Sequence, residues 1–417
     1  MHSFLVKMLS GSFLLCIFLY PFIVEGFHLH VIPQALLLAL GFCLLFNRSG
    51  DTMPAGVPVL VILMCFILTG MILLGVSRES FADEPNYLLL VKLFVNITSI
   101  ILCVLFLDIK PETQKRFIEL ILLVHFCMVM MIYGGKAFTP SWWDLVIKSA
   151  TGQISSVGRY GLAFDIEQWF GNKNLVGSFW GMLSAYYLYL CVTFKMRVSW
   201  FFYIIGLLLA LVCFSRAAEV IALVPLLVYF ALRFNTRILF YLMFALSIPV
   251  ALIFINILVQ FNDTDGFYTR FLSWVYFFEE AGDFWIVGQG FSLLNESIDL
   301  GEGSLSTGNY HVFFMNQIAT YGIGFLFLYV LYFILFFSIC KKVGAYGRYL
   351  LIPLSAYSVN VMVQNYGVEF QVLYPFILIG AVSNFKYLQS AQMRNGLMAR
   401  NDLAVANREL LVVNTRL

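Results

Sequence analysis

Long apolar runs separated by short polar segments dominate the chain. About twelve of them approach the roughly 20 residues that an α-helix needs to cross a bilayer. The runs centre near Leu14, Leu38, Met64, Ile100, Val124, Leu183, Leu207, Val224, Leu246, Phe327, Ser358 and Phe376. The pattern therefore predicts an all-α integral membrane protein with about twelve transmembrane helices.

Two of the connections between these runs are long. The first extends from about residue 135 to 171, and the second from about residue 261 to 310. Long connections without secondary structure of their own are usually functional, so we expect the chemistry of the protein there. We expect residues 1–384 to form one polytopic membrane domain, and residues 385–417 to form a polar C-terminal tail.

Composition excludes a water-soluble protein. Hydrophobic residues make up 61% of the chain and charged residues only 12%, whereas soluble domains contain about 25% charged residues. The formal net charge of +2 gives no strong attraction to nucleic acid. The bilayer is therefore the expected environment.

The few charges predict the orientation of the helices. If the runs are counted as alternating crossings, 17 of the 25 Lys and Arg residues fall on one side and 17 of the 23 acidic residues on the other. Basic residues accumulate on the cytoplasmic side of membrane proteins. We therefore expect both termini to be cytoplasmic and both long loops to be external.

Four of the eight external cations stand where a ligand could meet them: Arg159, Lys173, Arg216 and Arg270. Arg216 follows Ser215 in a very short turn between the seventh and eighth predicted helices. An arginine at the membrane surface requires an anionic partner. The alternative partner is Glu219, which lies one helical turn further and would make a purely structural ion pair. Arginines in long loops are also often only solvated.

Arginine binds phosphate through two parallel hydrogen bonds. Several arginines that converge from different loops would hold a diphosphate carried by a lipid, with Lys173 and Asn174 of Gly171-Asn172-Lys173-Asn174 beside them. His311, at the end of the second loop, would deprotonate an attacking hydroxyl or donate a hydrogen bond to the diphosphate. A structural histidine is the alternative, and carboxylates such as Asp165 and Glu167 are rival bases.

Other chemistries lack their motifs in this sequence. Metal-type Cys–His spacing is absent, as are a Walker A loop and a Gly-x-Gly-x-x-Gly segment after a strand. We therefore expect no cofactor and no bound metal.

In combination, these segments resemble the bacterial O-antigen polymerase and O-antigen ligase superfamily. Members are multispanning glycosyltransferases that use undecaprenyl-diphosphate-linked glycans. The segments that carry the resemblance are Arg159-Tyr160-Gly161, Gly171-Asn172-Lys173-Asn174, Ser215-Arg216-Ala217, Arg270 with Trp285-Ile286-Val287-Gly288-Gln289-Gly290, and His311 with Gly322-Ile323-Gly324. Val312 and Phe325 depart from the ligase pattern.

The resemblance implies glycosyl transfer at the periplasmic face of the inner membrane, without a metal. It implies catalytic roles for His311, Arg216 and Arg270, and substrate-binding roles for Arg159, Lys173, Asn174 and Ser215. Because Arg159 is followed by Gly171 and Arg270 by Gly282, the two-loop layout favours polymerisation of repeat units.

Two alternatives stay open: a ligase that transfers the glycan to lipid A–core, and a flippase or transporter of lipid-linked sugars. The expected partners are the lipid-linked glycan donor, a glycan or lipid A–core acceptor, the bilayer and a chain-length regulator protein.

Overall fold

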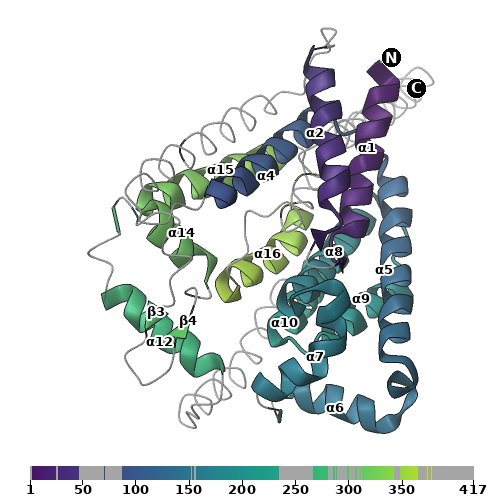
Figure 1. Ribbon diagram of the computed structural model, residues 1–417. Coiled ribbons are helices and arrows are strands. Elements are labelled where there is room, and N and C mark those ends of the chain that lie inside the picture. Colours follow the sequence, from purple (N-terminus) through teal and green to yellow (C-terminus); the bar gives the residue numbers. More distant parts are fainter. Residues whose placement is uncertain are drawn as a thin grey trace, which may run out of the picture.

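The computed structural model describes a mostly helical chain (Figure 1). The described residues are 2–24, 27–46, 70, 87–151, 153–154, 156–233, 266–279, 285–286, 288, 298–299, 306–307, 310, 312–341, 348–364, 373 and 377. Their helices are α1 (His2–Leu19), α2 (Val31–Phe46), α4 (Tyr87–Phe106), α5 (Pro111–Tyr133), η1 (Gly134–Phe138), α6 (Pro140–Ala150), α7 (Ser156–Phe170), α8 (Lys173–Thr193), α9 (Trp200–Val212), α10 (Arg216–Arg233), α12 (Gly266–Glu279), α14 (Phe313–Tyr321), α15 (Ile323–Lys341) and α16 (Leu351–Val363).

Strands make a very small contribution to the described residues. They form two antiparallel pairs of two-residue strands. These are β1 (Ile23–Val24) with β2 (Phe27–His28), and β3 (Ile298–Asp299) with β4 (Ser306–Thr307). The helical fold class expected from the apolar runs is confirmed for this part of the chain.

Three of the described helical segments are long and apolar enough to cross a membrane: α1, α8, and α5 together with η1. Nine of the predicted span centres fall in described helices; Met64, Leu246 and Phe376 lie outside the described residues. Several helices expose large apolar side chains, for example Phe327 on α15 and Met131 on α5. These properties are consistent with a membrane protein.

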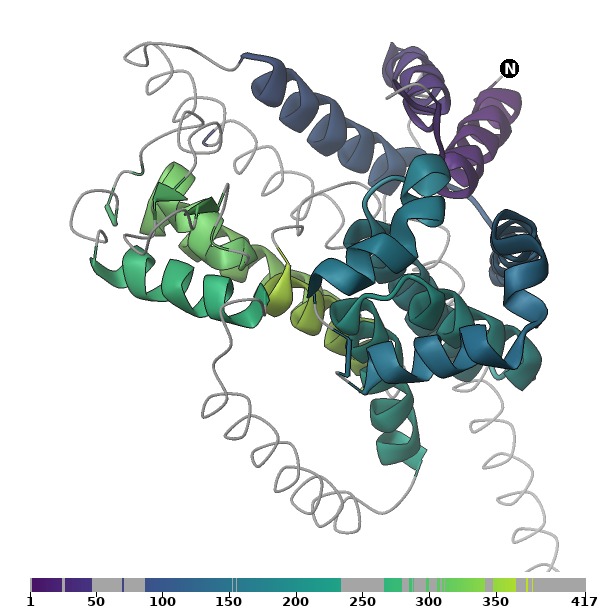
Figure 2. The ribbon, with the colours of Figure 1, turned by 60° about the horizontal axis from the view of Figure 1, so that its bottom comes forward.

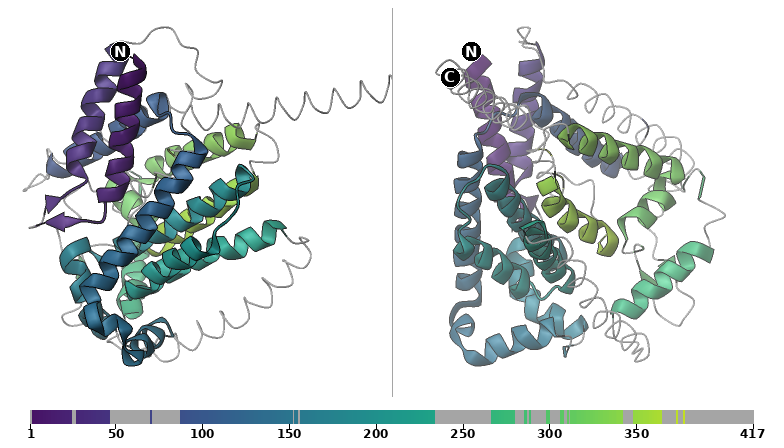
Figure 3. Two further views of the ribbon diagram at one scale, coloured as in Figure 1. Left: turned by 90° about the vertical axis from the view of Figure 1, so that its right-hand side faces the viewer. Right: turned by 180° about the vertical axis from the view of Figure 1, so that it is seen from behind.

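Four helices, α5, α8, α9 and α10, pack in alternating directions around a shared interior (Figure 3). At one end, the Tyr133 hydroxyl of α5 donates to the Val212 carbonyl of α9 over 3.0 Å. At the other end, the Trp200 ring of α9 stacks on Phe230 of α10, with ring centroids 6.0 Å apart. Almost every side chain of α8 is buried, so α8 is the central helix of this group.

Small residues allow α8 and α10 to approach closely. Gly177 and Gly181, four residues apart on α8, face Ala218 and Ala222 on α10, and these four residues form a glycine–alanine seam. A Cβ added to Gly177 would lie 2.5 Å from the Cβ of Ala218, and one added to Gly181 would lie 3.2 Å from the Ala222 nitrogen. Pairs of small residues at this spacing are typical of close helix contacts in membranes.

The first long connection has secondary structure of its own. Residues 135–171, expected to lack it, contain most of η1 together with α6 and α7. Pro140 begins α6, because proline suits the first turn of a helix. Trp142 and Val146, one turn apart, are both buried and anchor α6 crosswise to the end of α5 (Figure 1). The expectation of an unstructured loop is therefore wrong here.

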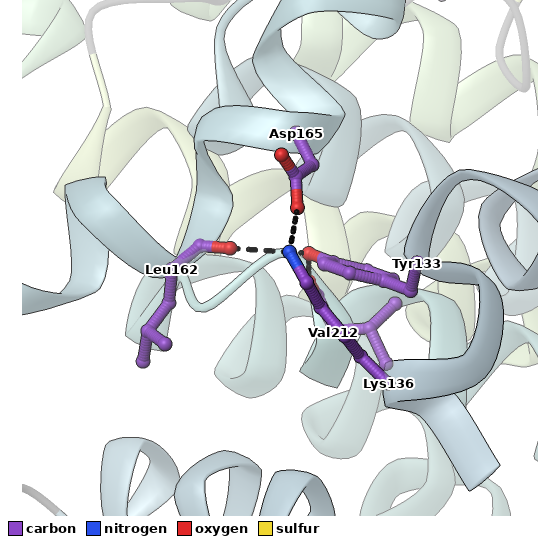
Figure 4. Close-up of polar contacts among 5 residues, drawn as sticks. All are labelled: Tyr133, Lys136, Leu162, Asp165 and Val212. Atoms are coloured by element: carbon purple, nitrogen blue, oxygen red, sulfur yellow. Dashed lines mark hydrogen bonds and ion pairs between the residues drawn. The ribbon is translucent and has the colours of Figure 1, made fainter.

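Polar contacts fix α7 against the end of α5 (Figure 4). The Lys136 ammonium of η1 pairs with the Asp165 carboxylate of α7 at 3.1 Å. The Tyr133 hydroxyl lies 3.5 Å from the Leu162 carbonyl of the same helix. The segment of residues 135–171 is thus held against the rest of the fold.

The described part of the second long connection includes α12 and the β3–β4 pair. The Trp274 indole of α12 donates to the Tyr310 carbonyl over 3.2 Å. The Tyr310 amide in turn donates to the Asn316 side chain of α14 over 3.0 Å. Residues on both sides of position 311 are therefore tied to α12 and α14.

Candidate functional site

Three of the cations predicted for the site belong to neighbouring helices, because α7 packs against α8 and α8 packs against α10 (Figure 1). Lys173 is the first residue of α8, Arg216 is the first residue of α10, and Arg159 belongs to α7. The glycine–alanine seam begins within one turn of both helix ends and determines their separation. We call this place the cation junction: Arg159, Lys173 and Arg216, with Glu167 and Glu219.

The members of the cation junction act on one another electrostatically. Glu219 interacts with Arg216 and also with Arg159. Lys173 interacts with Glu167 and with Arg159. Three cations therefore share two carboxylates, which leaves the cation junction with excess positive charge.

Hydrogen bonds organise the two helix ends. Asn172 caps α8, because its side-chain oxygen accepts from the Asn174 amide over 2.9 Å. The Glu167 carboxylate accepts from the Lys173 amide over 3.2 Å. The Ser215 hydroxyl donates to the Asn174 side-chain oxygen over 2.6 Å. The structure thus brings together Asn174 and Ser215, two residues that the sequence analysis assigned to one site.

Backbone strain marks the turn that carries Ser215 and Arg216. Phe214 has a φ of +52°, a left-handed conformation that costs a residue with a Cβ about 1–2 kcal/mol. Its ring is fully buried and lies edge-on to Trp142 of α6 and Tyr133 of α5. Packing of this ring therefore holds the short turn, and with it the start of α10, in place.

Two of the three cations of the cation junction are unusually buried. Lys173 is only 3% exposed and Arg159 only 9%, whereas these residue types are almost never buried without a partner. The Lys173 ammonium lies 3.7 Å from the centroid of the Tyr160 ring, a cation–π contact. Lys173 is consequently held by an aromatic face, a carboxylate and the fold around it.

Arg216 and Glu219 do not form the structural ion pair considered above. Within the described residues, no Arg216 nitrogen lies within 4.0 Å of a Glu219 oxygen. Arg216 stays partly exposed, while Glu219 is 8% exposed and lies between the influence of two arginines. Arg216 therefore keeps hydrogen-bond donors for a ligand, and Glu219 is a buried carboxylate beside the same site.

Arg270 comes from α12, in the second long connection. The backbone of Arg270 lies in α12; its side chain and the whole of His311 lie outside the described residues. α12 stands on the opposite side of the molecule from α5 and α6 (Figures 1 and 2). Among the described residues, α12 makes no extensive contact with α7 or α10, whereas α16 contacts both α10 and α14.

His125 is a buried histidine that the sequence analysis did not single out. Its Nε2 lies 3.1 Å from the Phe18 carbonyl, and its Nδ1 accepts from the Trp180 indole over 3.0 Å. Rings that include Phe22, Phe170 and Phe179 surround it. Because both ring nitrogens have partners, His125 links α1, α5 and α8 and is not free to act on a substrate.

Comparison of the whole chain with known proteins gave no match: no family model matches it, and no curated protein matches it. Groups of three or more His, Cys, Asp or Glu residues that would hold a metal do not occur in the described ranges. The interpretation of the cation junction therefore rests on its own residues, which suit an anion better than a cation.

Proposed function

We propose that this chain is a glycosyltransferase of the bacterial inner membrane that polymerises undecaprenyl-diphosphate-linked repeat units at the periplasmic face. One observation carries the proposal. Arg159 of α7 acts electrostatically on Lys173 and on Glu219, and Arg216 acts on the same Glu219, so cations from three different helices influence one another near the N-terminal ends of α8 and α10.

The cation junction suits a lipid diphosphate for two physical reasons. The N-terminal end of a helix carries partial positive charge, so two adjacent helix N-termini favour phosphate. Arg159 and Arg216 add planar donors that match two phosphate oxygens at once. Two helix ends and three cations are consistent with two linked phosphate groups.

The proposed reaction is a direct displacement at the sugar. An acceptor hydroxyl oxygen attacks the anomeric carbon, the carbon–oxygen bond to the diphosphate breaks, and the hydroxyl proton passes to a base. Donors aimed at the departing diphosphate stabilise the charge that grows on it. His311 is the base in this proposal, Arg270 joins the cations on the diphosphate, and the anomeric centre inverts.

The proposal includes about twelve membrane crossings with both termini in the cytoplasm. The alternating directions of α5, α8, α9 and α10 support it, because they gather the ends of these helices into two opposite groups. The cation junction lies in the group assigned to the periplasm.

Electrophoresis of surface glycans from a deletion strain tests the reaction class. Loss of a polymerase leaves a single repeat unit on lipid A–core, and this is the expected result. Bare core with accumulated lipid-linked polymer would instead identify a ligase. Normal glycan, with repeat units retained on the cytoplasmic leaflet, would identify a flippase and overturn the proposal.

Complementation of the same strain tests the cation junction. Arg216→Ala and Arg159→Ala should each lower the rate of assembly about 100- to 1,000-fold, the usual cost of removing one group that stabilises a developing charge. Immunoblots should find both variants in the membrane. Arg116→Ala, an exposed cation at the start of α5, is the matched control and should retain assembly. Full activity in both junction variants would exclude the diphosphate role.

A further inference from the structure

A cavity of about 530 Å³ opens at the end of α8 opposite the cation junction. Three parts of the chain line it: the segment from the end of α8 to the start of α9, the end of α10, and the residues just before α16. We call it the basic cavity. It shares no residue with the cation junction and takes no part in the proposed glycosyl transfer.

Four cations line the basic cavity: Lys195, Arg197, Arg233 and Arg348. Its described lining contains no carboxylate. None of the four cations forms an ion pair with a described Asp or Glu. Like charges gathered around a concave, low-dielectric wall raise the local concentration of counter-ions. The cavity therefore attracts anions.

Two of the arginines are already oriented by neighbouring tyrosines. Arg233 donates to the Tyr229 hydroxyl over 2.8 Å. Arg348 donates to the Tyr349 hydroxyl over 2.8 Å, and its guanidinium carbon lies 4.9 Å from the centroid of that ring. A guanidinium has five N–H donors, so each arginine keeps donors for a two-pronged contact with phosphate.

Lys195 is held at the cavity by an unfavourable backbone conformation. After α8 ends, the Met196 amide donates to the Cys191 carbonyl over 2.8 Å and the Lys195 amide donates to the Val192 carbonyl over 3.3 Å. This hydrogen-bond pattern normally carries glycine at the position of Lys195. The φ of Lys195 is +54°, a value that favours glycine. A lysine thus stands where the local backbone favours a residue without a Cβ.

The volume and position of the basic cavity indicate the class of ligand. About 530 Å³ falls within the usual range for sites that bind small molecules. Trp200, at the start of α9, lines the cavity and is partly exposed, as aromatic residues are at the membrane–water interface. Basic pockets between helices on the cytoplasmic side bind anionic headgroups. All four cations belong to the set that the sequence assigns to that side.

We infer that the basic cavity binds the phosphate group of an organic phosphate. The source of that phosphate is an anionic phospholipid headgroup or a soluble phosphate compound. The ligand is stabilised by Arg197, Arg233 and Arg348 through paired hydrogen bonds and by Lys195 as a point charge.

Thermal unfolding of the purified full-length chain in an uncharged detergent tests this inference. The midpoint is measured with dioleoylphosphatidylglycerol, with dioleoylphosphatidylcholine, and with inorganic pyrophosphate. The phosphatidylglycerol should raise the midpoint and the phosphatidylcholine should not, because only a net anion gains from the four cations. Arg197→Ala combined with Arg233→Ala should abolish the shift, whereas Arg116→Ala should keep it.

The same measurements distinguish the source of the phosphate. A shift with phosphatidylglycerol alone assigns the site to lipid. A shift with pyrophosphate as well, of which part is lost in Arg197→Ala/Arg233→Ala, assigns it to the phosphate group itself, because that variant keeps the cation junction. Each variant is compared with and without ligand, so an altered basal midpoint does not obscure the result. If the double variant does not accumulate, Lys195→Ala, on an exposed side chain, takes its place and should weaken the shift. An unchanged shift in these variants, an equal loss in Arg116→Ala, or no shift with any anion would overturn the inference.

Discussion

The cation junction and the basic cavity lie at opposite ends of α8, a helix of 21 residues and therefore roughly 30 Å long. At the cation junction, Lys173 and Arg159 are buried and the carboxylates Glu167 and Glu219 act on the cations. At the basic cavity, the four cations face an open space lined by no described carboxylate. Burial explains the difference, because a charge withdrawn from water needs a permanent partner.

The comparison also separates two ways of handling an anion. A partly compensated site stays folded without ligand and responds to charge that develops during a reaction. In a solvated site without carboxylates the cations repel one another weakly, and the site is stabilised most when a permanent anion binds. Four experiments test this contrast, beginning with the largest expected effect.

A bulky residue in the glycine–alanine seam should have the largest effect on stability, because it forces α8 and α10 apart next to the cation junction. Gly177→Leu would place a large side chain where even a Cβ lies 2.5 Å from Ala218, so we expect a loss of about 3 kcal/mol, the upper end of the usual cost of overpacking. Thermal unfolding in detergent measures the loss. Gly11→Leu on α1, where an added Cβ meets nothing within 4 Å, is the control and should change the midpoint little. Equal midpoints for the two variants would contradict a tight seam.

Replacing Lys195 should separate stability from binding at the basic cavity. Lys195→Gly relieves the positive φ and should raise stability by about 1 kcal/mol, while Lys195→Ala keeps the strain and should not. Both variants lose the charge, so both should bind phosphatidylglycerol more weakly. Thermal midpoints with and without that lipid measure the two effects. A stability gain in Lys195→Ala as large as in Lys195→Gly would contradict the role of strain.

The bond between Ser215 and Asn174 should couple α8 to α10. Ser215→Ala and Asn174→Ala should each cost about 1 kcal/mol, a typical value for one hydrogen bond. The double variant should cost less than the sum of the single variants, because both remove the same 2.6 Å contact. Unfolding midpoints of the four proteins complete this cycle. Strict additivity would show that the two residues act independently.

The salt dependence of pyrophosphate binding should also distinguish the two sites, and it is the smallest of the four expected effects. Raising the ionic strength from about 0.1 M to 1 M shortens the screening length from about 10 Å to 3 Å. Pyrophosphate binding by the exposed cavity should weaken several-fold, and binding by the buried cation junction should weaken less. Titration of Arg159→Ala/Arg216→Ala measures the cavity alone, and titration of Arg197→Ala/Arg233→Ala measures the cation junction alone. The reverse order of salt sensitivity would contradict the contrast in burial.

Apolar patterning predicted the helices well, because a bilayer-length run such as the one around Leu183 has few alternatives to a helix. It failed for residues 135–171, where α6 and α7 mix polar and apolar positions. There the signals for helix were local: Pro140 at a first turn, and Trp142 and Val146 spaced by one turn. Patterning by run length does not detect helices that lie across the ends of other helices.

The cation junction was partly predictable, because Lys173 and Arg216 stand at the ends of predicted helices. Alternating crossings place those two helix ends on the same side. Asn174 and Ser215 were assigned to one site and prove to be hydrogen-bonded. The sequence left a structural Arg216–Glu219 ion pair open as the alternative, and the structure has no such pair. The burial of Glu219 could not be predicted, because it depends on tertiary packing. Whether Arg270 and His311 act at the same site stays a prediction.

The basic cavity could not be predicted from spacing. Lys195, Arg233 and Arg348 come from three distant segments and served only to orient the helices. Each of them is ordinary for a cytoplasmic connection; the enclosure they share is a property of tertiary packing. Half of the glycine–alanine seam, Gly177 and Gly181, can be recognised from its spacing in the sequence. Its partners on α10 depend on how the helices pack and cannot be recognised in this way.

The sharp turn from α5 through η1 into α6 has a consequence for how the protein would sit in lipid. α6 lies crosswise and exposes Leu145 and Ile147, while the neighbouring Phe138 is exposed as well. An amphipathic helix in this orientation lies in the plane of the interface, at the boundary between headgroups and acyl chains. Because Phe214 packs on Trp142 of this helix, the position of α6 at the interface would also determine how deep Arg216 lies relative to the lipid headgroups. Shortening α6 would therefore move the cation junction vertically with respect to the headgroups of the surrounding lipid.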